Sequence, residues 1–160
     1  QLKFEVTSLT QLDLNGLTEV QLLFSANAGM SPKPIDKTAS GGELSRLMLA
    51  VQATMSDLKS LPTLILDEID TGVSGEVALR IGKLLQKMGE RLQLFAITHL
   101  PQVAAKGQQQ YEVSKFSQGN ETTTRIYQLS DTERLDAIAR LMSGDSLSEA
   151  AKANAQLLLN

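Results

Sequence analysis

Thr63-Leu64-Ile65-Leu66 is a continuous apolar run that ends in two acidic residues, Asp67 and Glu68. Such a run is typical of a strand buried on both faces, as strands in a parallel sheet usually are. The segment from Glu76 to Arg91 then carries apolar residues at helical spacing, and Leu92 to Thr98 is a second apolar run. A strand, a helix and a strand in this order predict neighbouring parallel strands joined by a right-handed crossover. The helix residues expected to point inward are Val77, Ile81, Leu84, Met88 and Leu92.

The residues before this unit predict a hairpin, a loop and a helix. The turn pair Asn15-Gly16 separates two short apolar stretches, Lys3 to Leu9 and Glu19 to Phe24. Prolines and a glycine make the segment from Asn27 to Lys37 a predicted loop. A helix is expected to begin at the glycines that follow, because apolar residues recur at helical spacing from Leu44 to Leu58.

The residues after the unit predict a short helix, a second hairpin and two terminal helices. Pro101 suits the first turn of a helix. Two strand-like stretches meet around Gly119-Asn120, and two Ser/Glu pairs have the spacing of a capping box. The predicted strands are Tyr111–Phe116 and Thr122–Leu129, and the predicted boxes are Ser130 with Glu133 and Ser146 with Glu149. The expected fold class is therefore α/β, a mainly parallel sheet flanked by helices, with antiparallel hairpins at its edges.

Composition excludes several classes of protein. The chain has 160 residues, of which 42% are hydrophobic and 21% charged, so a packed domain is expected and general disorder is not. No cysteine is present, which excludes disulfides and thiolate metal sites. A net charge of -3 does not favour non-specific binding of nucleic acid. The apolar stretches are far shorter than the ~20 residues that span a bilayer, so we expect a soluble protein without membrane contact.

Three polar side chains follow the two predicted parallel strands. Asp67 can hold Mg²⁺ and Glu68 can polarise an attacking water, while His99 follows the second strand. Carboxyl ends of parallel strands share an edge, where ligands of α/β sheets bind. The alternative is that the acids only begin a solvated loop, that Asp70 or Ser74 caps the next helix, and that the histidine is structural.

Two further patterns admit both a functional and a structural interpretation. Ser40-Gly41-Gly42-Glu43 begins a helix, so its backbone N–H groups could bind a phosphate, but Ser40 and Glu43 also form a capping box by themselves. A stripe of basic residues follows helical spacing on the second helix. It could contact DNA, although such a stripe is more often an ordinary solvated face. Its members are Arg80, Lys83, Lys87 and Arg91.

The order of these motifs resembles that of the ABC-type ATPases. The segment from Ser40 to Arg46 is similar to their signature motif, and Leu64 to Glu68 to their Walker B strand. The segment from Asp70 to Gly75 occupies the place of the D-loop, and His99 matches the switch histidine. Isoleucine after Glu68, where transporters usually have proline, points to the SMC-like DNA-repair branch of this superfamily.

The resemblance implies a role for each matched residue. Asp67 would support Mg²⁺, Glu68 would act as the general base, and His99 would contact the γ-phosphate of ATP. In the family two heads close on two nucleotides. Signature residues then meet the γ-phosphate bound by the opposite head, and a D-loop serine lies near the shared interface. The residues that match these positions are Ser40, Gly41, Gly42 and Ser74.

No G-x-x-x-x-G-K-[ST] phosphate loop occurs in these residues, and the long coiled coil of the family is absent from them. We therefore expect the carboxyl-terminal half of an ATPase head, which depends on an amino-terminal half and forms an ATP-dependent homodimer with a second head. The expected parts are a hairpin and loop over 1–38, the motifs over 39–106, and a hairpin with terminal helices over 107–160. Alone, the chain should not hydrolyse ATP.

The resemblance further implies work in DNA double-strand-break repair, with DNA bound through the full-length protein, in the cytoplasm at the nucleoid. Two other functions stay open. The chain could be a dimerisation or partner-docking module without catalysis, or the nucleotide-binding part of another ABC ATPase such as a transporter.

Overall fold

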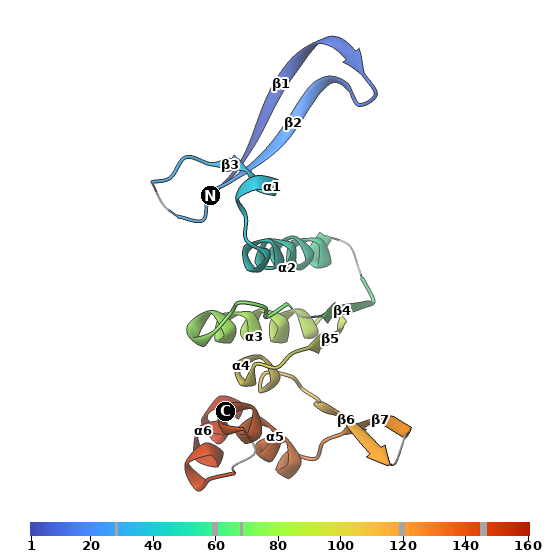
Figure 1. The fold of residues 1–160 in the computed structure, drawn as a ribbon, viewed down its shortest axis with the longest axis vertical. Helices are drawn as coiled ribbons and strands as arrows, with labels where there is room; N and C mark the ends of the chain where they lie inside the picture. Colours follow the sequence, from blue (N-terminus) through green and yellow to red (C-terminus); the bar gives the residue numbers. More distant parts are fainter. Residues whose placement is uncertain (28, 59–60, 68, 119–120, 145–146) are drawn as a thin grey trace. The chain divides into compact units, whose positions relative to one another are not determined.

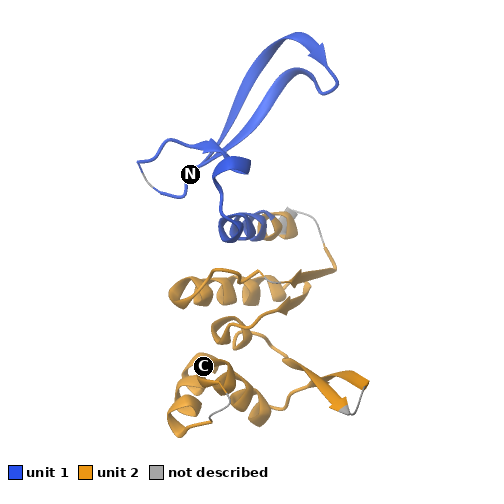
Figure 2. Cartoon of the chain, viewed as in Figure 1, with its two compact units in different colours: residues 1–51 blue, residues 52–160 orange. Residues whose placement is uncertain are grey.

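The computed structural model describes residues 1–27, 29–58, 61–67, 69–118, 121–144 and 147–160 (Figure 1). The chain divides into two compact units, Gln1–Val51 and Gln52–Asn160, drawn in blue and orange in Figure 2. Each unit is built from neighbouring segments of the sequence, so each is described by itself.

The first unit contains the predicted amino-terminal hairpin. Strands β1 (Leu2–Asp13) and β2 (Gly16–Phe24) pair antiparallel; β1 is longer than predicted at both ends, and β2 begins earlier than predicted but ends at Phe24 as expected. Gly16 has a φ of 110°, a value that favours glycine at this tight turn. The loop expected over residues 27–37 is partly wrong, because it contains β3 (Lys33–Pro34) and most of helix α1 (Ile35–Thr38). Pro34 is tolerated because β3 is a two-residue strand at the sheet edge.

Helix α2 (Gly41–Leu58) begins at the glycines, as predicted. Its apolar face is largely exposed: the side chains of Leu44, Met48, Val51 and Met55 are between 39% and 51% accessible. Leu49 is buried at 3%. The helix therefore presents to solvent a surface that its sequence pattern assigns to a protein interior.

The second unit contains the predicted crossover. Strands β4 (Thr63–Asp67) and β5 (Gln93–Ile97) are parallel neighbours, joined through helix α3 (Gly75–Gly89). Five residues of α3 are buried: Ala78, Ile81, Gly82, Leu85 and Met88. The inward direction predicted for Val77 is wrong, since 46% of this residue is exposed, and Leu84 is only half-buried. The buried stripe is centred on Ile81 and Leu85 and leaves Val77 at its margin.

The expectation that the sheet is buried on both faces is also wrong. Leu66 is 3% exposed, whereas Ile65, its neighbour in the strand, is 67% exposed. Ile65 pairs with Phe95, which is 45% exposed, and Ile97 further along β5 is 58% exposed. Since successive side chains alternate between faces, one face of this two-stranded sheet is covered and the other is bare and apolar.

The remainder of the second unit follows the prediction closely. Helix α4 (Pro101–Ala104) begins at Pro101, and strands β6 (Tyr111–Gln118) and β7 (Glu121–Gln128) form the second hairpin, whose turn at Gly119-Asn120 lies outside the described residues. Helices α5 (Asp131–Ser143) and α6 (Glu149–Leu159) pack against each other and enclose a small core. The buried members of that core are Ala105, Ile138, Ala139, Ala151 and Ala155.

The two terminal helices test the capping predictions. Ser130 accepts a hydrogen bond from the Glu133 N–H, and the Glu133 carboxylate accepts one from the Ser130 N–H at 2.8 Å, so α5 begins with the predicted capping box. The cap predicted at Ser146 is wrong. Helix α6 begins after Ser148, whose hydroxyl accepts from the Ala151 N–H at 3.1 Å, and Ser146 lies outside the described residues.

Within the described ranges, no helix combines the length and apolar character that crossing a membrane requires.

Candidate functional site at the carboxyl edge of strands β4 and β5

The carboxyl ends of β4 and β5 lie at one edge of the sheet, as the sequence predicted. Asp67 is the last residue of β4 and pairs in register with Ile97, the last residue of β5. His99 follows two residues after this pair, so parallel pairing brings its segment to the edge that carries Asp67. Glu68, the predicted general base, is next to Asp67 in the chain but lies outside the described residues.

Asp70 ties the loop after β4 to the loop after β5. Its side chain is only 1% exposed, and its Oδ2 atom accepts hydrogen bonds from the Thr98 hydroxyl and from the His99 N–H at 3.2 Å. The Thr98 hydroxyl oxygen in turn accepts from the Leu100 N–H at 3.0 Å. Asp70 is therefore not the helix cap that the sequence left open, but an anchor for the segment that holds His99.

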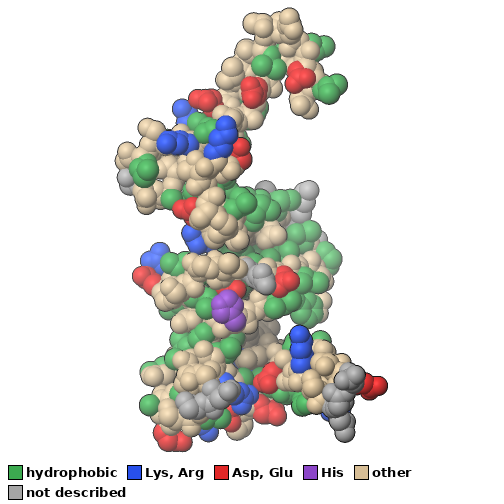
Figure 3. Space-filling view, in the orientation of Figure 1, with side chains coloured by type: hydrophobic (Ala, Val, Ile, Leu, Met, Phe, Trp, Pro, Cys, Tyr) green, Lys and Arg blue, Asp and Glu red, His purple; other side chains and the backbone are tan. Residues whose placement is uncertain are grey.

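His99 is exposed. Its side chain is 74% accessible, and Figure 3 shows the histidine, in purple, on the visible surface. The Nδ1 atom lies 3.6 Å from Oδ1 of the buried Asp70, so one side of the ring faces a carboxylate while most of the ring faces solvent. This arrangement disfavours the structural interpretation of His99, which would place the ring in the core with its polar atoms satisfied.

Asp67 offers one exposed carboxylate for a metal ion. In the part of the chain that the structure describes, no cluster of three or more acidic, histidine or cysteine residues could hold a metal ion. Mg²⁺ does not require such a cluster, because it commonly binds one or two carboxylates together with substrate phosphates and water. The donor set therefore fits Mg²⁺ brought with a phosphate ligand and does not fit a metal ion held by the protein alone.

Ser74 occupies the N-cap position of α3 with extended backbone angles. Its side chain makes no capping hydrogen bond to the helix, which leaves its exposed hydroxyl available for another partner. The loop before it turns at Gly72, whose φ is 68°, and Gly75 follows with a φ of 56°. These two glycines permit the left-handed backbone that brings Ser74 to the start of α3.

In the first unit, Ser40 and Glu43 form the predicted capping box at the start of α2. The Glu43 carboxylate accepts from the Ser40 N–H and from its hydroxyl, both at 2.8 Å. The hydrogen bond from the Ser40 N–H, and after it the one from the Ser40 hydroxyl, hold the pKa of Glu43 below its ordinary value. A Cβ on Gly41 would meet no atom within 4 Å, so a ligand can approach this terminus. A phosphate bound there would have to compete with the Glu43 carboxylate for Ser40.

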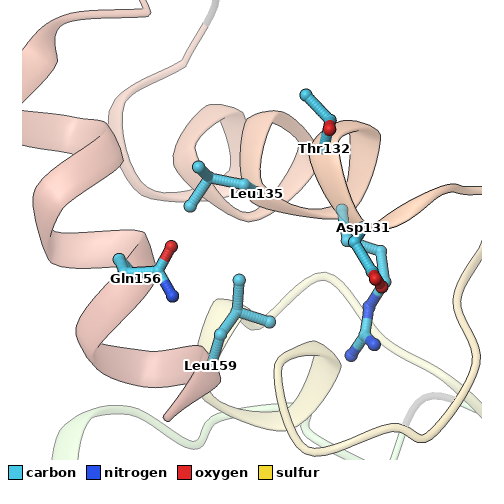
Figure 4. A pocket seen from close by; sticks show the side chains of 6 residues that line it. Asp131, Thr132, Leu135, Gln156 and Leu159 are labelled. Carbon is cyan, nitrogen blue, oxygen red and sulfur yellow. The ribbon is translucent and has the colours of Figure 1, made fainter.

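The basic stripe fits the interpretation as a solvated face, although only Arg80, Lys83 and Lys87 lie on α3 and Arg91 follows its end. All four of its residues are exposed, and Arg80 pairs with Glu76 at 2.7 Å on its own helix. A shallow depression of about 390 Å³ lies between α5 and α6 (Figure 4) and contains no residue that the sequence marked as functional. Neither feature adds a residue to the candidate site.

Comparison with known proteins shows related sequences over nearly the whole chain. The chain is 47% identical over 154 residues to the DNA repair protein RecN of Haemophilus influenzae. The matched region covers 96% of this chain and 28% of that protein. The RecN proteins of Vibrio cholerae and Xylella fastidiosa are 44% and 43% identical over about nine tenths of the chain. The chain thus spans about a quarter of the length of these relatives. No protein-family model matches it.

Solved structures show the fold. A Smc head domain with a coiled coil and joint from Pyrococcus yayanosii matches 91% of this chain and 26% of that chain, with a TM-score of 0.65 and 22% identity. A structure from work on ATP-driven dimerisation and DNA-stimulated activation of SMC ATPases matches 89% of this chain and 84% of that chain, with a TM-score of 0.60 and 20% identity. The chain therefore has the fold of part of an SMC-type ATPase head.

Proposed function

This chain is related to a segment of the DNA repair protein RecN along nearly its whole length, and from this premise we propose that it forms the carboxyl-terminal lobe of an ATPase head. The head would bind and hydrolyse ATP as part of a longer protein that repairs DNA double-strand breaks in the bacterial cytoplasm, at the nucleoid. Residues 1–160 would form this lobe as a whole.

The observation that carries the proposal is the shared strand edge. Parallel pairing ends β4 at Asp67 and sends β5 into His99, so one exposed carboxylate and one exposed imidazole come from neighbouring strand ends. Asp67 would hold Mg²⁺ through the phosphates of ATP, Glu68 would orient or deprotonate the attacking water, and His99 would contact the γ-phosphate. A binding module without catalysis would not need these three residue types in this order.

The remaining predicted residues would act across a dimer. Ser40, Gly41 and Gly42 would meet the γ-phosphate held by a second head, and Ser74 would lie near the interface between the heads. Two observations support these assignments. The space around Gly41 is open, and the Ser74 hydroxyl makes no capping hydrogen bond to α3. The Ser40 N–H and hydroxyl would then donate to a phosphate oxygen in place of the Glu43 carboxylate. Closure of the two heads would therefore depend on the bound nucleotide.

The exposed apolar face of the β4–β5 sheet supports the proposal that a second, amino-terminal half of the head packs on it. A parallel sheet normally has both faces covered, but here Ile65, Phe95 and Ile97 are exposed on one face. No phosphate loop lies within these residues, and phosphoryl transfer needs its backbone and lysine to position the β- and γ-phosphates. An amino-terminal half that supplies the loop would also cover this face, and the 160 residues alone would not hydrolyse ATP.

Replacement of Glu68 by glutamine in the full-length protein tests the assignment. Loss of the base should reduce ATP turnover by about 10²-fold or more and trap heads closed on bound ATP. Trapping can be followed by size-exclusion chromatography with light scattering. Glu121→Gln on β7, an identical chemical change at an exposed residue, should leave turnover unchanged. Wild-type turnover by Glu68→Gln would remove Glu68 from its proposed role.

A further inference from the structure

The buried carboxylate of Asp70 has one oxygen that accepts hydrogen bonds and one that has no hydrogen-bond partner among the described residues. Oδ2 accepts from the Thr98 hydroxyl and the His99 N–H, whereas Oδ1 has no hydrogen-bond partner among the described residues. A buried carboxylate oxygen without a donor is costly, so a partner for Oδ1 is expected. The Nδ1 atom of His99 lies 3.6 Å away, just beyond hydrogen-bonding distance.

The chemistry of the two groups decides how they can meet. An ionised carboxylate only accepts hydrogen bonds, so Nδ1 must carry a proton to satisfy Oδ1. The His99 ring is largely exposed, so a small rotation can close the gap. The carboxylate itself is held by Thr98, whose hydroxyl is fixed by its bond to the Leu100 N–H, and therefore the ring is the part that moves.

We propose that Asp70 is a positioning residue for His99, which keeps the proton of the imidazole on Nδ1 and presents Nε2 to the ligand. The two ring nitrogens are not equivalent, and the one that is hydrogen-bonded to the protein sets the role of the other. The consequence for catalysis rests on the proposed ATPase function. The assignment of the proton does not, because it follows from the contact between Asp70 and His99 alone.

The tautomer can be measured directly. His99 is the only histidine in these 160 residues, so ¹⁵N-histidine labelling of this segment in the full-length protein yields the signals of a single ring. Two-bond ¹⁵N–¹H correlation spectra distinguish a ring protonated at Nδ1 from one protonated at Nε2. We expect the Nδ1–H form in the wild-type protein. A neutral ring protonated mainly at Nε2 would overturn the proposal, and this result needs no variant to fold.

Asp70→Asn removes the charge and keeps the shape. The asparagine oxygen can still accept from Thr98 and from the His99 N–H, but its NH₂ group would then face Nδ1 as a donor. The ring should therefore shift to the Nε2–H form. Thr98→Val, which removes a hydroxyl from the same network and leaves the carboxylate opposite the ring, should retain the Nδ1–H form. An unchanged tautomer in Asp70→Asn would contradict the assignment.

Kinetics of the full-length protein separate positioning from a purely structural effect. Asp70→Asn should lower kcat by about 10- to 100-fold with little change in KM for ATP, since a misplaced catalytic group costs about this much. In a His99→Ala background the same substitution should cost nothing more. If Asp70→Asn lowers kcat by the same factor in the His99→Ala background as in the wild-type protein, Asp70 acts only on the fold. If the wild-type protein does not hydrolyse ATP, the proposed function fails, while the tautomer measurement still decides the role of Asp70.

Discussion

Gly82 of α3 lies directly against the backbone of Gln102 in α4. A Cβ on Gly82 would be only 2.7 Å from the Gln102 carbonyl oxygen and 3.3 Å from the Val103 Cα, and neither of these backbone atoms can easily move aside. The absence of a side chain thus sets how closely the two helices approach. Since α4 begins two residues after His99, this contact also supports the segment that carries the histidine.

Gly82→Ala should destabilise the protein by about 1–3 kcal/mol, because the added methyl group forces the helices apart. The free energy of unfolding, measured by urea titration, checks this value. Gly89→Ala at the end of the same helix is the matched control, as its Cβ would meet nothing within 4 Å. That variant should be neutral or gain up to about 1 kcal/mol from helix propensity. Equal effects of the two substitutions would contradict the close contact.

Acid should weaken the starts of α2 and α5. Hydrogen bonds from Ser40 hold the pKa of Glu43, and those from Ser130 the pKa of Glu133, below their ordinary value of 4.5. A lowered folded-state pKa stabilises the fold above the unfolded-state pKa, and this contribution disappears as pH falls through the folded value. Helicity by circular dichroism should therefore be constant from pH 7 to about pH 5 and decline below the unfolded-state pKa.

The double variant Glu43→Gln with Glu133→Gln isolates this effect, since glutamine preserves the capping box but does not titrate. Its thermal midpoint should fall less between pH 5 and pH 3 than that of the wild-type protein. Glu121→Gln, a change at an exposed residue of β7, should keep the wild-type loss. The same loss in the double variant would mean that other carboxylates cause the decline.

Ile138→Ala should cost about 2–5 kcal/mol, because the Ile138 side chain is completely buried among the alanines of α5 and α6. Small residues around it let the helices approach closely, which leaves little freedom for the core to collapse into the cavity. Leu157→Ala on α6, where the side chain is 74% exposed, should change stability by less than about 0.5 kcal/mol. Unfolding free energies of both variants test this contrast.

Local signals predicted the order of the elements well. The turn at Asn15-Gly16, the capping box at Ser130 and the parallel pairing of β4 with β5 depend on backbone preferences and periodicity that a sequence displays directly. The cap predicted at Ser146 is wrong because capping-box spacing favours a serine with a glutamate three residues later, whereas Ser148 caps α6 with its hydroxyl alone and has Ala151 at that position.

Burial was the harder quantity to predict. An apolar run such as Thr63 to Leu66 indicates only that its residues favour an interior, whereas the actual burial depends on which segments pack on each face. Ile65 is exposed because nothing among the described residues of the second unit covers its face. The link from Asp70 to His99 was missed for a related reason. An acidic residue in a loop resembles many solvated ones, and its burial arises from the meeting of two loops distant in the sequence.

The bare face of the β4–β5 sheet should make the isolated 160 residues self-associate. Ile65 and Phe95 are exposed partners on adjacent strands, and water excluded from such a surface favours contact with a second copy or with the complementary half of the head. Sedimentation should show a mass that rises with concentration. Ile65→Thr with Phe95→Thr should shift the chain toward the monomer, because threonine keeps the strand preference and reduces the apolar area.

Leu157→Thr, which polarises an exposed leucine on α6 instead, should leave the association as it is in the wild-type chain. Addition of the amino-terminal half of the head should also dissolve the self-association, since it would compete for the same face. The Ile65/Phe95 double variant should then bind that half less tightly. A wild-type chain that stays monomeric at every concentration would show that this face needs no cover, and would remove one support for the missing half.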